Sequence, residues 1–416
     1  MFNKNKKLIE KIVDIKEAVN QILLGSLVIL FPLNQQYHFR PYPSVDGFII
    51  DYLILKVSIP EILLFLIFFL NLKEIIKIVL SSKYYRFLFP FFVLLTISVI
   101  QSNYLYLALY ENFLLILMIL VGIYFFKNPE ILNKKLLLGS VKFWFIFLTL
   151  LGSAQFLSQS SIFNNYALSG EFPYTEDYYH IKQKNIFFEN LIPPYTIFSH
   201  SNIFGGYIII LFILLTLISG IDKRFLVLTL VNLILVGSVA CILAFVVFLF
   251  SFKLKREFLM IFIKFIFFFS IAVYLIFSYR FSDFSGDFSI YRRLYMFDLS
   301  LNYFISNPLN FLFGSGYFNY FSIVKNDLYN YELVRFFQPP HFALNLIIWQ
   351  YGFIFLSLII FTFIKFFSKF NIEFLRLILV ILILLSFDHY LITNHQFKVI
   401  FLILLPYSLK LKNSIK

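Results

Sequence analysis

The stretch that decides the fold of this chain begins with SYRFSDFSGDFSIYRRLYMF at 278–297 and ends with QPPHFALNLIIWQYG at 338–352. It is rich in polar and charged side chains, whereas nearly all of the sequence on either side of it is apolar. Such a segment predicts a large loop outside a membrane, which re-enters the apolar phase at His341. If the protein catalyses a reaction, we expect the reaction where this loop meets the membrane surface.

The composition places most of the chain in a membrane. Of the 416 residues, 60% are hydrophobic and 21% are aromatic, and the mean hydropathy is +0.85. A soluble globular protein is closer to half apolar. We therefore expect an all-α, polytopic transmembrane helical bundle that forms a single domain over 1–416.

The basic residues indicate membrane orientation and not nucleic-acid binding. The net charge is +13, but Lys and Arg cluster in short segments between apolar runs, as the positive-inside rule requires of cytoplasmic loops. These segments lie at 3–7, 73–86, 133–135, 222–224, 253–257 and 410–416. Because Cys241 is the only cysteine, an internal disulfide and a cysteine-based metal site are both excluded.

Apolar runs of suitable length predict about twelve membrane spans. With that count, both termini and every Lys-rich loop lie on the cytoplasmic side of the membrane. The large extracytoplasmic loops are then 158–202 and 278–341, and helical spacing over 290–305 predicts an amphipathic helix on the outer leaflet. The expected spans are 20–33, 58–72, 87–102, 104–126, 136–157, 203–219, two in 225–252 separated near Gly237, 258–277, 342–364, 375–387 and 397–410.

Arginines in the second loop are the first candidates for substrate binding. The acids of this loop balance its bases, so the loop is not a general basic patch. Guanidinium groups bind phosphate oxygens through two parallel hydrogen bonds, which suits a phosphorylated substrate. The alternative is that these side chains pair with nearby acids or anchor at lipid headgroups. The arginines are Arg280, Arg292, Arg293 and Arg335.

Histidines supply the candidate base. His341 follows Pro339 and Pro340 and begins an apolar run, so it lies near the outer interface. A neutral imidazole there can take a proton from an attacking hydroxyl group. The alternative is an interfacial histidine that is hydrogen-bonded to the backbone.

Two further groups of polar residues stand beside expected spans. His200 and Asn202 offer polar groups beside Gly205 and Gly206, and these glycines would permit close packing. The alternative is that the polar groups only cap a helix, through Ser201 or Asn202. The turn at 388–396 contains an aspartate and two histidines, which could bind a metal ion. It lacks zinc-type spacing, however, so we expect a solvated loop and no metal site.

One acid lies within an expected span. Glu111 falls in the span at 104–126, and an ionisable group in a membrane is a functional candidate by default.

At these same residues the chain resembles the O-antigen ligase and O-antigen polymerase family. Its segment Tyr195–Asn202 with Gly205-Gly206 is similar to that family's Tyr-Gly-Thr-Phe-x-His-x-Asn stretch. A second similar piece consists of Ser289, Ile290 and Arg293, followed by Asn307-Pro308 and Gly314-x-Gly316-x-Phe318. A third is Pro340-His341 with Gln350-x-Gly352, and the last is the turn Asp388–Gln396.

The resemblance implies a GT-C-type membrane glycosyltransferase. It would take glycan from an undecaprenyl-diphosphate donor and transfer it to a hydroxyl of an acceptor glycan or glycolipid, without a nucleotide sugar, required metal or other cofactor. It implies that Arg293 binds the diphosphate and that His341 acts as base or positions the acceptor. The other residues that we expect to bind substrate are Arg292, Arg280, Arg335, His200, Asn202 and Tyr195. Membrane lipid and partners in a glycan-assembly complex are expected; nucleic acid is not.

The sequence departs from the family pattern at four positions. Pro193 and Val239 occupy places where family members often carry arginine, and Phe342 and Gln350 replace an Asn and a Glu. We expect Arg280, Arg292 or Arg335 to replace the missing cations. Two alternative functions stay open, which are a flippase or transporter for lipid-linked glycan and a non-catalytic subunit of a glycan-assembly complex. Because the polar residues gather in outer loops and not along the spans, the enzyme is favoured.

Overall fold

The structure is a computed structural model, and the described part of the chain is mostly helical. The residues described are 2–33, 35–40, 42–45, 48–81, 85–166, 170–171, 184–186, 189–267, 288–325, 338–367 and 370–413. Three antiparallel two-stranded sheets lie in the segments between helices, and their strands are too short for periodicity to predict. They pair β1 (Gln36–His38) with β4 (Lys56–Ser58), β2 (Ser44–Val45) with β3 (Phe48–Ile49), and β5 (Lys184–Ile186) with β6 (Glu189–Leu191).

Every apolar segment expected to span a membrane contains helix within the described residues. The long helices are α1 (Phe2–Leu30), α2 (Ile59–Leu70), α4 (Tyr85–Gln101), α5 (Leu105–Lys127), α6 (Lys134–Ser158), α8 (Ser201–Ser219), α9 (Lys223–Val236), α10 (Val239–Ser251), a helix over 256–267, α16 (Ala343–Phe367), α17 (Ile372–Phe387) and α19 (His395–Asn413). The predicted break near Gly237 is confirmed, because this glycine ends α9 with a φ of 59°.

Shorter helices connect them, and they include the helix predicted in the second loop. They are η1 (Asp51–Leu53), α3 (Leu72–Ser81), η2 (Pro129–Ile131), α12 (Phe288–Ser306), α13 (Pro308–Phe313), α14 (Tyr320–Ile323) and α18 (Tyr390–Thr393). In α12, Met296, Ser300 and Phe304 are buried at intervals of four residues, so one face of this helix packs into the protein.

Four of the described helices are long and apolar enough to cross a membrane. These are Leu105–Lys127, Lys134–Ser158, Ser201–Ser219 and Ala343–Lys365. Shorter apolar helices occur at Ile59–Leu70, Leu88–Gln101 and Val239–Ser251. By length and composition this is a helical protein with segments suited to a membrane.

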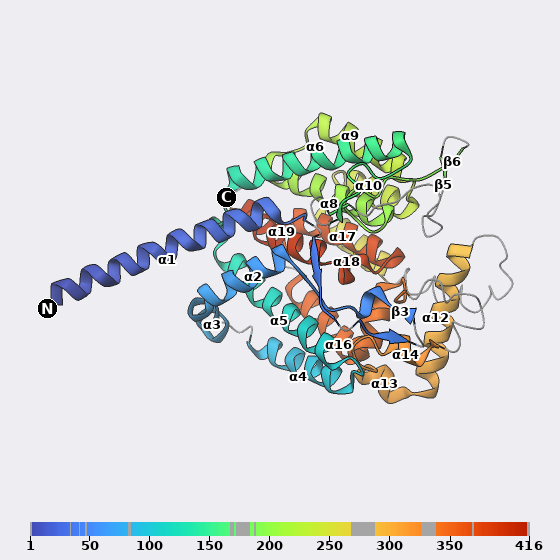
Figure 1. Cartoon of the computed structure of the whole chain (residues 1–416), viewed down its shortest axis with the longest axis horizontal. Helices are drawn as coiled ribbons and strands as arrows, with labels where there is room; N and C mark the ends of the chain where they lie inside the picture. Colours follow the sequence, from blue (N-terminus) through green and yellow to red (C-terminus); the bar gives the residue numbers. More distant parts are fainter. Residues whose placement is uncertain are drawn as a thin grey trace.

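The helix α8 is the centre of the larger core. It is apolar on all sides, and 83% of its apolar window is buried inside the protein, as expected for a helix without a solvated face. Around it pack α6, α9, α10, α17 and α19. Figure 1 shows α6 and α9 along one side of the body, while α1 extends away from it toward the N terminus.

A second, smaller core joins the polar loop to the helices. Buried side chains of α12, α14 and the turn between α13 and α14 pack with residues of α4 and α16. The indole Nε1 of Trp349 and the amide of Asn345 both donate to Ser300 Oγ at 2.8 Å, which ties α16 to α12. In Figure 1, α12 lies at the edge of the body opposite α1. The second core therefore holds the loop that carries Arg293.

A glycine within α16 permits the closest approach in this region. Gly352 interrupts the helix with a φ of 84°, and its backbone lies against Leu312 and Gly314. Any side chain at this position would collide with the carbonyl oxygen of Leu312. The docking of α13 on α16 therefore depends on the missing Cβ atom.

Replacing this glycine tests the docking. We expect Gly352→Ala to destabilise the protein by about 1–3 kcal/mol from backbone strain alone, with the collision adding to it. The control is Gly139→Ala in α6, where an added Cβ meets nothing within 4 Å and a small gain in stability is expected. Thermal unfolding in detergent measures both, and equal melting temperatures would contradict the close packing.

Candidate functional site

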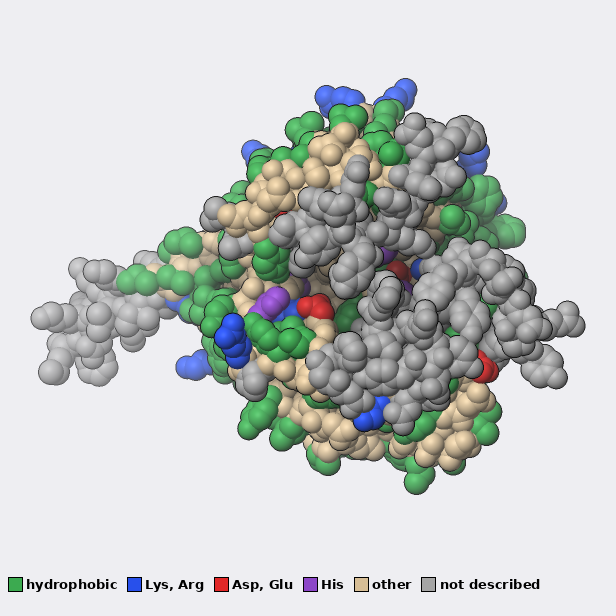
Figure 2. Space-filling view, turned by 45° about the vertical axis from the view of Figure 1, so that its right-hand side comes forward, with side chains coloured by type: hydrophobic (Ala, Val, Ile, Leu, Met, Phe, Trp, Pro, Cys, Tyr) green, Lys and Arg blue, Asp and Glu red, His purple; other side chains and the backbone are tan. Residues whose placement is uncertain are grey.

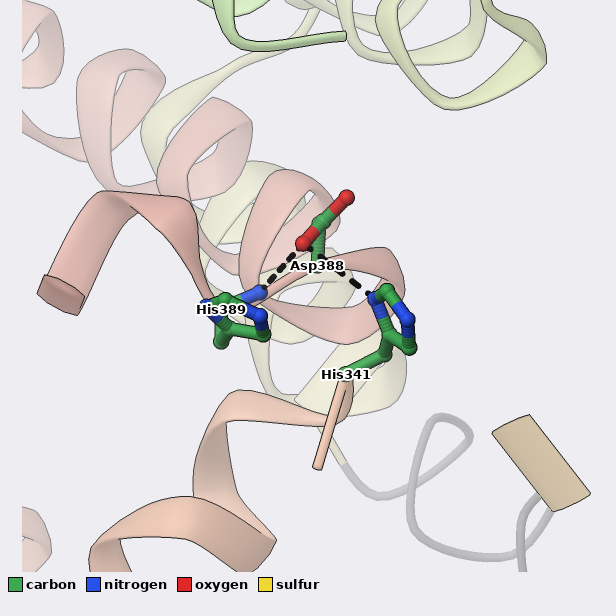
Figure 3. Close-up of side chains that lie close together, drawn as sticks. All are labelled: His341, Asp388 and His389. Atoms are coloured by element: carbon green, nitrogen blue, oxygen red, sulfur yellow. Dashed lines mark hydrogen bonds and ion pairs between the residues drawn. The ribbon is translucent and has the colours of Figure 1, made fainter. Parts of the chain in front are cut away.

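Three side chains from two separate parts of the chain converge beside the second loop (Figure 3). His341 lies just before α16, whereas Asp388 and His389 lie between α17 and α18. The ring Nδ1 of His341 is 3.5 Å from Asp388 Oδ1, and the same oxygen accepts a 2.8 Å hydrogen bond from the backbone N–H of His389. The two imidazole rings are 5.5 Å apart.

The local sequence explains these positions. Pro339 and Pro340 disfavour helix in the residues just before them, and α16 begins at Ala343, two residues after His341. At the end of α17, Asp388 adopts an extended conformation and its backbone N–H closes the last turn onto Leu384. The carboxylate is thereby turned out of the helix toward His341.

The Asp388 carboxylate is surrounded by positive groups. Only 13% of this side chain is exposed, and burial alone would raise its pKa. The hydrogen bond with His341 and the charges of His341, His389 and Arg293 outweigh burial and hold the pKa of Asp388 well below its usual range. The aspartate is therefore ionised at neutral pH.

Arg293 on α12 completes this group. Its positive charge acts on Asp388, and its Nε atom is buried without a hydrogen-bond partner among the described residues. A buried donor left without a partner costs roughly 1–3 kcal/mol, which an anionic ligand could recover. The structure thus brings together the two residues predicted to be catalytic, Arg293 and His341.

The arrangement suits a base. If Nδ1 of His341 donates toward Asp388, the lone pair lies on Nε2, which can accept a proton. Figure 2 shows histidine, acidic and basic side chains together in a recess in the middle of one face of the molecule.

The other residues predicted to bind substrate are only partly described by the structure. Arg280 and Arg335 lie outside the described residues, and for Arg292 only the backbone, in α12, is described. His200 caps α8, because its Nδ1 accepts from the backbone N–H of Asn202 at 3.1 Å. A helix cap is therefore present, but the capping residue is His200 and not Ser201 or Asn202. Tyr195 is buried beside it, with ring centroids 5.8 Å apart.

The α8 segment reaches the site through Tyr390. The hydroxyl group of Tyr390 lies against Gly206, where any side chain would collide with it, and 4.0 Å from the Cys241 sulfur. That sulfur in turn lies 3.6 Å from the backbone oxygen of Asn202. Close packing at Gly206, expected from the sequence, is confirmed.

Buried amide and acid side chains that the sequence did not mark support the 193–198 segment. Gln155 Oε1 accepts from the backbone N–H groups of Tyr195 and Thr196, and Gln155 Nε2 donates to Glu171 at 2.5 Å. Glu171 is fully buried and also accepts three backbone N–H groups at 162–164. No local pattern signals this role, since the contacts span up to 41 residues.

The expectation of a solvated loop at 388–396 is wrong for most of its polar residues. His389, Tyr390, His395 and Gln396 are all less than 9% exposed. The loop is buried because α18 packs against α17 and α19, which no periodicity in the loop itself could indicate. The ligand atoms of His341, Asp388 and His389 lie within 4.8 Å of one another, so this group could hold a metal ion.

A small apolar pocket adjoins the site. It is formed by the helix over 256–267, the start of α16 and the end of α17. Phe342 and Ser386, which line it, stand one residue after His341 and two before Asp388. The other lining residues are Phe267, Leu344, Leu382 and Leu385.

Glu111, the acid expected within a span, has a cationic partner. Its Oε2 accepts from Lys398 Nζ on α19 at 3.1 Å, and the two side chains are 21% and 19% exposed. The pair therefore joins α5 to α19 in a region where a single charge would be costly. Glu61 at the start of α2 lies nearby and accepts from Ser58 and Tyr110.

No protein-family model, curated protein or solved structure matches this chain. The class defined by fold and geometry is thus a mostly helical protein with helices of membrane-spanning length. Its candidate site combines a cation, a carboxylate and imidazoles.

A double-mutant cycle tests the pair between α5 and α19. We expect Lys398→Met and Glu111→Gln each to lower thermal stability, because each leaves the other group in an apolar region without its partner. The double variant should lose less stability than the two single variants lose together, and the difference, which is the coupling energy of the pair, should be roughly 0.5–3 kcal/mol. Strictly additive losses in detergent-solubilised protein would show that the two charges do not interact.

Proposed function

We propose that this protein is a membrane glycosyltransferase that uses a lipid-diphosphate donor. It would move glycan from undecaprenyl diphosphate to a sugar hydroxyl at the outer face of a bacterial cytoplasmic membrane, either by ligation or by polymerisation. One observation carries the proposal: the buried Nε of Arg293, which has no hydrogen-bond partner among the described residues, acts beside the pair of His341 and Asp388. A cation ready for an anion and a base held by a carboxylate are the parts that this transfer requires.

In the proposed reaction, Nε2 of His341 takes the proton of the acceptor hydroxyl group. The hydroxyl oxygen then forms a bond to the anomeric carbon of the donor sugar as the bond from that carbon to the diphosphate oxygen breaks. The electron pair leaves with the diphosphate, whose growing charge Arg293 stabilises. Asp388 stabilises the imidazolium that forms, and solvent later receives its proton.

Apolar side chains near the site support a lipid-linked donor. Phe342 and Leu344 at the start of α16 face Leu382 and Leu385 near the end of α17 across a narrow apolar gap. An isoprenoid chain needs a hydrocarbon surface where it meets its charged headgroup. We propose that the chain of the donor lies against the surface that these side chains form.

A transporter of lipid-linked glycan is the second candidate. It is favoured by the ionisable group of Glu61, Glu111 and Lys398, which lies on the helices α2, α5 and α19. Transport moves the lipid across the membrane with no bond changed, whereas transfer makes a covalent product. Purified protein in vesicles with a lipid-linked oligosaccharide therefore separates the two, because a longer or newly attached glycan appears only by transfer.

Membrane topology is part of the proposal. We propose twelve spans, with both termini in the cytoplasm and the loops 158–202 and 278–341 outside. A reporter fused near residue 320 should therefore be active outside the cytoplasm, and fusions in the Lys-rich segment 253–257 should be active inside. A cytoplasmic signal near residue 320 would contradict the topology.

Substitution of the two central residues tests the chemistry. We expect His341→Ala to lower the transfer rate by about 10²–10⁴-fold through loss of the base. Arg293→Ala should lower it by about 10²–10³-fold through loss of charge stabilisation. Glycan chain length on gels and product formation in vesicles measure the effect.

The matched control is Arg224→Ala, because Arg224 is an exposed arginine paired with Asp222 at the start of α9. Its transfer rate should equal that of the unaltered protein. Normal glycan ladders in both the His341→Ala and Arg293→Ala proteins, with normal membrane insertion, would overturn the site assignment.

A further inference from the structure

We propose that His341, Asp388 and His389 bind a divalent transition-metal ion of the zinc class, and that the bound ion blocks transfer. The metal-binding part stands on the geometry alone. The inhibitory part rests on the proposed function, because His341 would serve as base there. Neither part follows from the sequence pattern.

The donor set fits such an ion. Each of the three side chains offers one ligand atom, and these atoms all lie within 4.8 Å of one another. Two imidazole nitrogens and one carboxylate oxygen are the ligands that zinc and its neighbours prefer, whereas Mg²⁺ and Ca²⁺ take oxygen. Three protein ligands leave a fourth position for water.

Contacts around the ligands already orient two of them. His389 Nδ1 lies 3.0 Å from Thr393 Oγ1, an arrangement that favours Nε2 as the metal ligand. The backbone N–H of His389 holds Asp388 Oδ1 at 2.8 Å. Because Asp388 and His389 come from one turn, the backbone holds these two ligands close together.

An ion can reach the site. The side chains of His341 and Asp388 are 14% and 13% exposed, while His389 lies deeper. The ligands are therefore largely buried, but two of them keep an exposed surface through which an ion can enter.

Arg293 opposes the ion. Its positive charge acts on Asp388, so it would repel a dication bound to that carboxylate. The charge of Arg293 thus favours an anionic substrate and disfavours a metal ion on His341. We infer reversible, inhibitory binding for this reason, since a bound metal occupies the imidazole that would take the proton.

The sequence hides this site because its ligands are far apart. His341 precedes Asp388 by 47 residues, so no short zinc motif exists. Only the packing of the α17–α18 turn beside the start of α16 joins them.

The test uses the full chain in nanodiscs, carrying no polyhistidine tag and freed of metal by a chelator. Titration with Zn²⁺ alone, followed by calorimetry, should give saturable binding with one ion per chain. We expect Asp388→Asn and His389→Ala to weaken binding by about tenfold or more, and Thr393→Val to weaken it by about 10–100-fold. Arg293→Gln should strengthen it, because the repelling cation is gone.

His38→Ala is the matched control, as this histidine lies in β1 and is not part of the cluster. Its Zn²⁺ affinity should be unchanged. No binding by the unaltered chain, or equal binding by all variants, would overturn the metal site. Size-exclusion profiles identify any variant that fails to fold. In that case Thr393→Val still tests the metal site, because it keeps all three ligands and nearly the same side-chain volume.

Inhibition is measured separately as the ratio of transfer rates with and without Zn²⁺. This ratio should be low for the unaltered chain and should rise toward one in Thr393→Val. Metal binding without any effect on transfer would overturn the inhibitory part. Metal binding by a chain that transfers no glycan would uphold the metal site and overturn the proposed function.

Discussion

A carboxylate buried among helices is stable only when donors and cations replace its lost hydration. Asp388 meets this requirement with the backbone N–H of His389, the ring of His341 and the charge of Arg293. These groups come from the α17–α18 turn, the start of α16 and α12. The groups that stabilise the Asp388 carboxylate therefore come from three segments that are far apart in the sequence. The candidate site lies where these segments pack together.

The scaffold behind this site is the second core. Trp349 and Asn345 of α16 hold Ser300 of α12, while Gly352 lets α13 approach the α16 backbone. Arg293 stands two helical turns before Ser300 on the same helix, so its position depends on this packing. A reactive group carried by a loop can be positioned only if the loop is docked on rigid elements, as it is here.

The same atoms serve two kinds of chemistry in our proposals. With an anionic substrate at Arg293, His341 is a base that Asp388 orients. With a dication present, His341 and Asp388 become ligands and the base is lost. The two states exclude each other because the guanidinium group of Arg293 and a metal ion on Asp388 are both positive and repel each other at short distance.

The sequence by itself determined the long apolar helices, because a segment of membrane-spanning length satisfies its backbone hydrogen bonds within itself only as a helix. It also marked Arg293 and His341, since they stand in a polar segment between apolar runs where such side chains stand out. It could not determine that Asp388 and His389 join them, that Glu111 pairs with Lys398, or that Gln155 and Glu171 support the 193–198 segment. Those contacts are decided by tertiary packing, because they link residues tens to hundreds of positions apart that no local period relates.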